Sequence, residues 1–124
     1  MITATPGEAG HGPVVTVSAP AGLVFLSGVT PDLAQVERRV PTPIADQLRL
    51  TLDNLNEMLA LRRLGWGAVA KVILYLTDVR EVSAWEGAVS ARFGDSWRPA
   101  LTVVQVDNLV HRGTRVTLDV IAGG

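Results

Sequence analysis

The chain contains no cysteine among its 124 residues. This absence excludes disulfide bonds, thiol catalysis and thiolate metal sites, and it is compatible with a reducing compartment. Histidine is nearly absent too, since only His11 and His111 occur and no metal-ligand spacing joins either one to a carboxylate. We therefore expect both to be solvated loop residues, and we expect neither a metal site nor a cofactor.

The sequence also lacks a large excess of charge of one sign, long apolar runs and nucleotide-binding motifs. Eleven basic and 12 acidic residues give a net charge of −1 without a basic stripe, so nucleic acid is not an expected partner. No apolar run approaches the roughly 20 residues of a membrane span, and Met1–Pro6 lacks the features of a signal peptide. Neither a phosphate-binding glycine loop nor a GxSxG motif occurs. We expect a cytoplasmic protein that does not bind a membrane.

The patterning of apolar residues predicts one α+β domain spanning residues 1–124, with residues 1–12 as a loose lead-in. The predicted order is β-β-α-β-α-β-β, in which the first two strands form a hairpin. Two helices can cover one face of a single mixed sheet, and the apolar residues of the other face then favour self-association. The elements are strands 14–17, 23–28, 69–77, 100–106 and 115–122, and helices 43–63 and 78–93.

The first predicted helix has signals at both ends. Thr42 is expected to cap its start, because Pro43 follows at the first helical position. Gly65 is expected just past its end, in a left-handed backbone conformation. Leucines recur between these ends at spacings of three or four, which is typical of a helix that packs one face on a sheet.

Two features of the sequence are candidates for chemistry. Asp119 lies among apolar residues of the last predicted strand, either on the wetter face of an edge strand or in a cleft where it holds water or moves a proton. The second candidate is Trp97-Arg98-Pro99, which could line a ligand or subunit contact, or could simply pack Trp97 on the end of the second helix.

Five segments of the chain, in order and with fitting spacing, resemble the Rid (reactive intermediate deaminase, YjgF-like) family over about residues 12–122. No single segment is specific, but the five together are. The resemblance implies a chorismate-mutase-like subunit and a homotrimer whose clefts for a small molecule lie at subunit boundaries. The segments are Phe25–Gly28, Gln47–Leu55, Val69–Asp78, Arg98–Ala100 and Leu118–Ala122.

The resemblance also implies a pocket with four departures from the family pattern. Family deaminases hydrolyse enamines and imines such as 2-aminoacrylate, and an arginine directly after Pro-Ala clamps the substrate carboxylate. Leu101 occupies that position here, so the clamp is expected to be missing. Val14 stands at the position of a pocket tyrosine, and Glu86 at that of an asparagine. Asp119 stands at that of a glutamate that helps to position water.

The remaining pocket residues implied by the resemblance are Ser27, Gly28 and Ala100. Arg98 is a candidate replacement for the missing guanidinium. It stands three residues from Leu101, which is about 10 Å along an extended strand and on the opposite face. Arg98 could therefore replace the clamp only if the loop before the strand were unusual.

Taken with the resemblance, these residues favour a trimer that acts on a small imine, enamine or enol-type metabolite with altered chemistry. Asp119 and Glu86 are the expected acid, base or water-positioning groups. A non-catalytic trimer that binds a small ligand is the alternative, favoured by the loss of the clamp. RNA cleavage, reported for some relatives, is opposed by the acidic charge balance.

Overall fold

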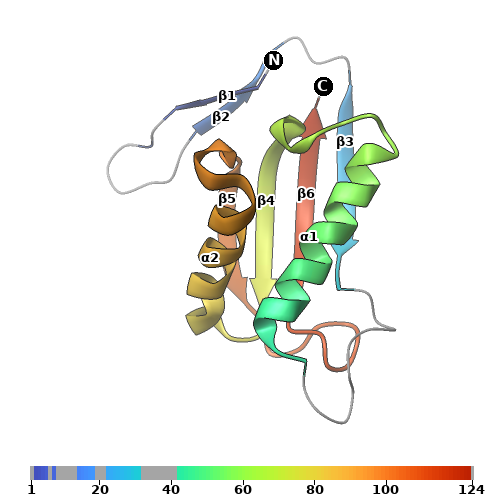
Figure 1. Ribbon diagram of the computed structural model, residues 1–124, viewed down its shortest axis with the longest axis vertical. Helices are drawn as coiled ribbons and strands as arrows, with labels where there is room; N and C mark the ends of the chain where they lie inside the picture. The colour runs from blue at the N-terminus through green and yellow to red at the C-terminus, as the bar shows by residue number, and fades with distance from the viewer. Residues whose placement is uncertain (1, 6, 8–13, 19–21, 32–41, 124) are drawn as a thin grey trace.

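The computed structural model of the chain describes residues 2–5, 7, 14–18, 22–31 and 42–123. Figure 1 shows a four-stranded sheet with two helices on the same side of it. The strand order is β3-β6-β4-β5, with β4 and β5 parallel and the other pairs antiparallel. The predicted α+β class, with two helices on one face of a mixed sheet, is confirmed. The elements are β3 (Leu23–Val29), α1 (Ile44–Ala60), β4 (Val69–Leu76), α2 (Val82–Phe93), β5 (Ala100–Gln105) and β6 (Val116–Gly123).

The core lies between the helices and the sheet. Along β4 and β6 every second residue is buried, because successive side chains of a strand point to opposite faces. The buried rows include Val72, Leu74 and Leu118, which are fully buried against the helices. The stripe predicted for α1, which begins at Ile44, is confirmed: Ile44 is partly buried, and the leucines that follow are at most 1 % exposed. These leucines are Leu48, Leu52, Leu55 and Leu59.

The other face of the sheet, which we call the open face, is turned away from both helices. The strand register places Ile73, Asp119 and Thr102 in one row across it. Large apolar side chains of β3 lie on this face in the open, with Phe25 68 % exposed and Leu23 51 % exposed. The apolar second face expected from the sequence is therefore present along β3, whereas the neighbouring strands carry polar side chains such as Asp119 and Thr102 on it.

The N-terminal segment differs from the prediction. Ile2–Thr5 forms strand β1, which pairs with β2 (Val14–Val17) in a separate two-stranded sheet. A loose lead-in is thus the wrong prediction for Ile2–Thr5, and so is a hairpin between the strands 14–17 and 23–28. The pairing is explained by matching alternation, because Ile2 and Ala4 are half-buried while Thr3 and Thr5 are exposed. His11 lies outside the described residues.

Both ends of α1 also differ from the prediction. Pro43 is the capping residue, and no side chain caps the first turn. At the other end Arg63, not Gly65, takes the left-handed conformation, with φ of 57°. This turn lets the N–H of Leu64 bond the carbonyl of Leu59, and the Leu64 side chain then packs against the core. Such a contact just past a helix end is a frequent partner of the left-handed turn, and it accounts for a non-glycine residue there.

Candidate functional site

Asp119 lies opposite a β-bulge in the neighbouring strand. In the pairing of β3 with β6, Leu26 faces Val120 and Val29 faces Leu118, so that both Ser27 and Gly28 stand opposite Asp119. Gly28 has φ of 59°, a conformation that glycine adopts at little cost and that bulges often require. Bulges are over-represented next to active sites, where they leave backbone groups unpaired.

The strand that carries Asp119 is not an edge strand. β6 lies between β3 and β4, which corrects the interpretation of Asp119 as a residue of a sheet edge. Its side chain is nevertheless exposed on the open face, and no hydrogen bond or ion pair joins it to another described residue. Nearby polar groups are engaged, since Lys71 Nζ donates to Thr102 Oγ1 at 2.7 Å and Thr117 Oγ1 donates to the carbonyl of Val29 at 3.2 Å. Asp119 is thus a free carboxylate able to accept a proton or hold a water molecule.

A hollow of about 220 Å³ begins at the bulge. Thr117, two residues before Asp119 on the same face of β6, forms part of its wall. Thr114 is only 5 % exposed, and its Oγ1 has no hydrogen-bond partner within the described ranges. An unpaired buried hydroxyl is uncommon in folded proteins. The lining residues are Gly28, Thr30, Leu109, Val110, His111, Thr114 and Thr117.

The loop that forms this wall is held from the far side of the sheet. Gln47 of α1 is fully buried, and its Nε2 donates to the carbonyl of Gly113 at 2.9 Å. Its Oε1 accepts from the backbone N–H of Arg115 at 2.8 Å, so the residues on both sides of Thr114 are bonded to one amide group. The guanidinium of Arg115 in turn pairs with Glu81. Thr114 therefore occupies a fixed position in the wall.

No described helix is long and apolar enough to cross a membrane. Within the same parts of the chain, no group of three or more histidine, aspartate or glutamate side chains is arranged to hold a metal ion. The described residues that line the hollow offer threonine hydroxyls and one imidazole, while the free carboxylate of Asp119 lies opposite the bulge and is not part of the lining.

Comparison with known proteins decides the family. Residues 8–123 match the model of the family described as Endoribonuclease L-PSP. The chain belongs to this family, that of the YjgF/Rid proteins. The resemblance inferred from the five segments is thereby confirmed.

Proteins from several organisms are similar to the chain. The mitochondrial protein mmf2 of Schizosaccharomyces pombe is 29 % identical over 113 residues, covering 90 % of this chain and 87 % of the relative. The structure of YyfA from Yersinia pestis superposes with a TM-score of 0.72 at 23 % identity, over 95 % of this chain and 90 % of YyfA. The structure of TdcF from Escherichia coli with bound serine superposes with a TM-score of 0.71 at 23 % identity, over 88 % and 84 % of the two chains.

Within one Rid chain the predicted site residues fall into separate groups. Ser27, Gly28 and Asp119 are brought together at the bulge. Leu101 lies elsewhere, because it pairs with Val72 and so points to the helix side of the edge strand β5, where it is 36 % exposed. Glu86 is exposed on α2, which lies on that same side.

The remaining predicted residues are also apart from Asp119. Ala100 pairs with Lys71 and belongs to the open face. Val14 is 58 % exposed on β2. Arg98 lines a different hollow of about 160 Å³, near Trp66 and Ser96. Within a single chain, the hypothesis that Arg98 replaces the clamp has no geometric support.

Sequence reasoning missed His111 and Thr114 as residues of the candidate site. The available signal was their place in the turn between the last two strands, directly before the strand of Asp119. The turn residues themselves carry no pattern that indicates a pocket. Their role follows from the fold, because β3 and β6 pair and bring the bulge beside this turn.

Proposed function

We propose that this Rid-family chain forms a homotrimer and acts on a small imine, enamine or enol-type metabolite in clefts between subunits. The observation that supports the proposal is the free carboxylate of Asp119 opposite the Ser27–Gly28 bulge, beside a hollow lined by hydroxyls. A free carboxylate can hold a water molecule and move its proton. We expect the reaction to need no cofactor.

The separation of the predicted residues supports a cleft between subunits. Asp119 is on the open face, whereas Leu101 and Glu86 belong to the helix side and the β5 edge. A second copy seated on the open face would cover Phe25 and could bring its own β5 edge toward Asp119. The site would then be incomplete in a single chain.

Hydrolysis of an imine needs one water molecule and proton transfer. Asp119 would accept a proton from water as the water oxygen bonds to the carbon of the C=N group. Return of that proton to the nitrogen would give a carbinolamine, with OH and NH2 on the same carbon. Asp119 would then move the hydroxyl proton to the nitrogen as the C–N bond breaks, which releases ammonia and leaves a C=O group. Glu86 is the candidate for a second acid or base, and the Thr114 hydroxyl is a candidate donor to the substrate.

Leu101 sets the expected substrate class. If it stands where relatives have arginine, a substrate carboxylate loses a charge-assisted bond of about 1.5–3 kcal/mol. Small imines derived from amino acids would then bind poorly, and a larger or less acidic molecule would fit better. This is the non-standard chemistry that we propose for the chain.

Two alternatives remain distinct from this proposal. A non-catalytic trimer that binds a small ligand is favoured by Leu101, and TdcF with bound serine is an example of a family member that holds a small molecule. RNA cleavage is suggested by the family description but disfavoured by the net charge of −1. A cytoplasmic location stays a prediction, since the name of mmf2 places that relative in mitochondria.

The test is ammonia release from freshly generated 2-iminopropionate and from a bulkier neutral imine. We expect turnover of the neutral imine, a loss of about 100-fold or more in kcat for Asp119→Asn, and no loss for the exposed control Asp95→Asn. Leu101→Arg should gain activity on 2-iminopropionate. Efficient native turnover of 2-iminopropionate would refute our interpretation of Leu101, and saturable binding without any turnover would favour the non-catalytic alternative. Sedimentation as a 13.2 kDa monomer would contradict the trimer.

A further inference from the structure

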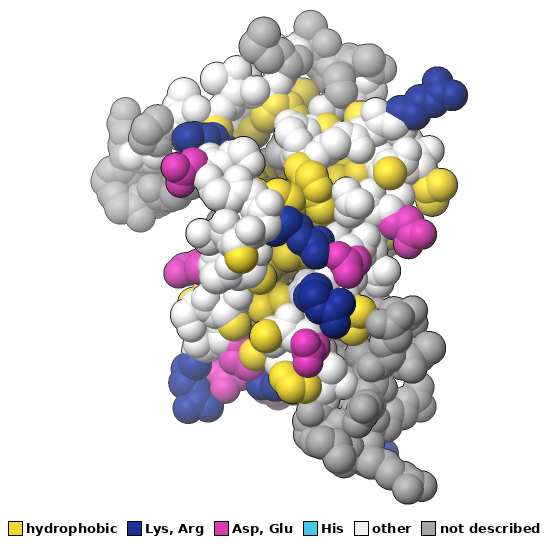
Figure 2. Space-filling model, viewed as in Figure 1, with side chains coloured by type: hydrophobic (Ala, Val, Ile, Leu, Met, Phe, Trp, Pro, Cys, Tyr) yellow, Lys and Arg dark blue, Asp and Glu magenta, His cyan; other side chains and the backbone are white. Residues whose placement is uncertain are grey.

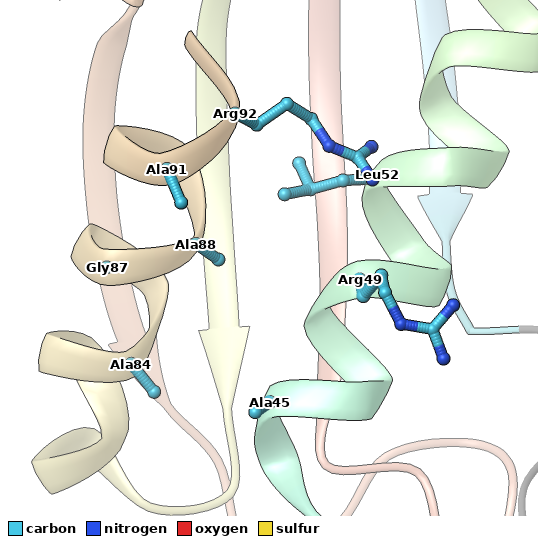
Figure 3. A pocket seen from close by; sticks show the side chains of 8 residues that line it. All are labelled: Ala45, Arg49, Leu52, Ala84, Gly87, Ala88, Ala91 and Arg92. Atoms are coloured by element: carbon cyan, nitrogen blue, oxygen red, sulfur yellow. The ribbon is translucent and has the colours of Figure 1, made fainter. Parts of the chain in front are cut away.

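A second hollow lies on the helix side of the molecule, in the groove between α1 and α2 (Figure 3). Its volume of about 500 Å³ is more than twice that of the hollow beside Asp119. Figure 2 shows hydrophobic side chains along the valley between the helices, with charged side chains beside it. The apolar lining residues are Ala45 and Leu52 of α1 and Ala84, Gly87, Ala88 and Ala91 of α2.

The groove exists because α2 presents small residues to α1. Residues 84, 87, 88 and 91 share one side of the helix, while Trp85 and Val89 take the side that packs on the sheet. The sheet therefore holds the two helices in place, but their facing side chains are too small to fill the space between them. The resulting volume is within the range of roughly 300–1,000 Å³ that is usual for small-molecule sites.

Arg49 and Arg92 are the charged residues that line the groove. Arg92 reaches from α2 toward α1, as Figure 3 shows, and its Nη2 bonds Asp53 Oδ1 at 2.5 Å. Arg49 extends from α1 on the side turned away from α2 in Figure 3, and its side chain is 58 % exposed. It forms ion pairs with Asp46 and Asp53, whose carboxylate oxygens lie 4.0 and 3.8 Å from its guanidinium nitrogens, beyond hydrogen-bond distance. None of the described residues accepts a hydrogen bond from Arg49.

We propose that this groove binds a small amphiphilic carboxylate. The apolar body would lie on the alanine and glycine floor, which is otherwise exposed to water. The carboxylate would take the planar donor fork of Arg49, which would turn toward the groove and exchange its two long, solvent-exposed ion pairs with Asp46 and Asp53 for direct hydrogen bonds to the ligand. Arg92 would add positive charge from the other helix. The site is independent of the proposed function, because the groove and Asp119 are on opposite sides of the sheet.

The experiment is a titration of the ¹⁵N-labelled full chain with octanoate, followed by backbone amide shifts, with octan-1-ol as the neutral match. We expect octanoate to shift amides of residues 45–52 and 84–92 in a saturable way, and octan-1-ol to bind at least about 10-fold more weakly. Losing a charge-assisted hydrogen bond corresponds to about 10- to 100-fold in affinity. Equal binding of the two probes, or octanoate shifts confined to the open face, would overturn the proposal.

Two substitutions test whether octanoate binds in the groove. No atom lies within 4 Å of the position where a Cβ of Gly87 would stand, so Gly87→Leu can fill the groove without a clash. It should weaken octanoate binding about 10-fold or more, with Gly87→Ala as the control that keeps most of the space. Arg49→Gln should weaken octanoate binding but leave octan-1-ol unchanged. Unchanged octanoate binding in Gly87→Leu would refute the site, and so would groove shifts that depend only on protein concentration, which would indicate a second copy as the occupant.

Discussion

Replacing Gln47 by leucine should test how α1 supports the candidate site. The side chain is fully buried, and its Nε2 bonds the carbonyls of Thr42 at 3.1 Å and Gly113 at 2.9 Å, while its Oε1 accepts from Arg115 N at 2.8 Å. Leucine has a similar size but can neither donate nor accept. The substitution would remove all three bonds and release the backbone on both sides of Thr114.

The magnitude follows from the groups left without a partner. A buried donor or acceptor that loses its partner costs about 1–3 kcal/mol, and a neutral hydrogen bond contributes about 0.5–1.5 kcal/mol net. Burial of the more apolar leucine offsets part of this loss. We expect Gln47→Leu to lower the free energy of unfolding by about 3 kcal/mol. For a chain of this length, such a change lowers Tm by roughly 10 °C.

Urea denaturation and thermal unfolding measure this change, with Gln105→Leu as the matched control. Gln105 is exposed, and its Oε1 accepts one bond from the N–H of Val79, so its replacement should cost less than about 1 kcal/mol. If Gln47→Leu destabilises no more than the control, the three bonds do not hold the loop. The amide shifts of residues 109–114 in the folded variant should also differ from those of the native chain. Native shifts in that loop would likewise refute the reasoning.

Two further predictions concern backbone strain and pH. Gly28→Ala should destabilise the fold by about 1 kcal/mol, because φ at this position is 59°. Gly87→Ala should stabilise the fold by about 0.5–1 kcal/mol, because glycine inside a helix such as α2 is less favourable than alanine. Urea denaturation midpoints measure both changes. The hydrogen bond from the Arg80 side chain, aided by that from its backbone N–H, holds the pKa of the Asp78 carboxyl below its ordinary value of 3.8. The stabilisation is present above that value and lost as pH falls through the lowered pKa, so Asp78→Asn should flatten the acid limb of a stability profile. An acid limb unchanged in Asp78→Asn, or equal effects of alanine at the two glycines, would contradict these arguments.

The elements that build the core could be predicted because their patterns are strong and local. The leucine stripe of α1 and the alternation in β6 each bury one side of a continuous element, and the structure follows both. The pairing of the strands was harder to predict from the sequence. The segment 14–17 was short enough to pair with either neighbour, and the choice of Ile2–Thr5 depends on the matched alternation of two strands that each carry little signal.

The candidate site could be predicted from the sequence only in part. The resemblance indicated Ser27, Gly28 and Asp119, but nothing in the sequence predicts that two residues of one strand stand opposite a single residue of another. The bulge is a consequence of register between strands far apart in the chain. The wall residues Thr114 and His111 depend on the same long-range pairing, and no local pattern indicated them.

The placement of Leu101 changes how the expected loss of the arginine clamp is understood. The sequence placed Leu101 and Asp119 in one pocket, where leucine in place of arginine would remove a positive charge. In the structure the two lie on opposite faces of one sheet, so a leucine at the β5 edge alters the candidate site only through the surface that it offers to another copy. Leu101 is therefore a candidate determinant of both subunit contact and ligand choice. Leu101→Arg, which adds a charge at an apolar edge, should be assayed for assembly before any change in activity is assigned to substrate binding.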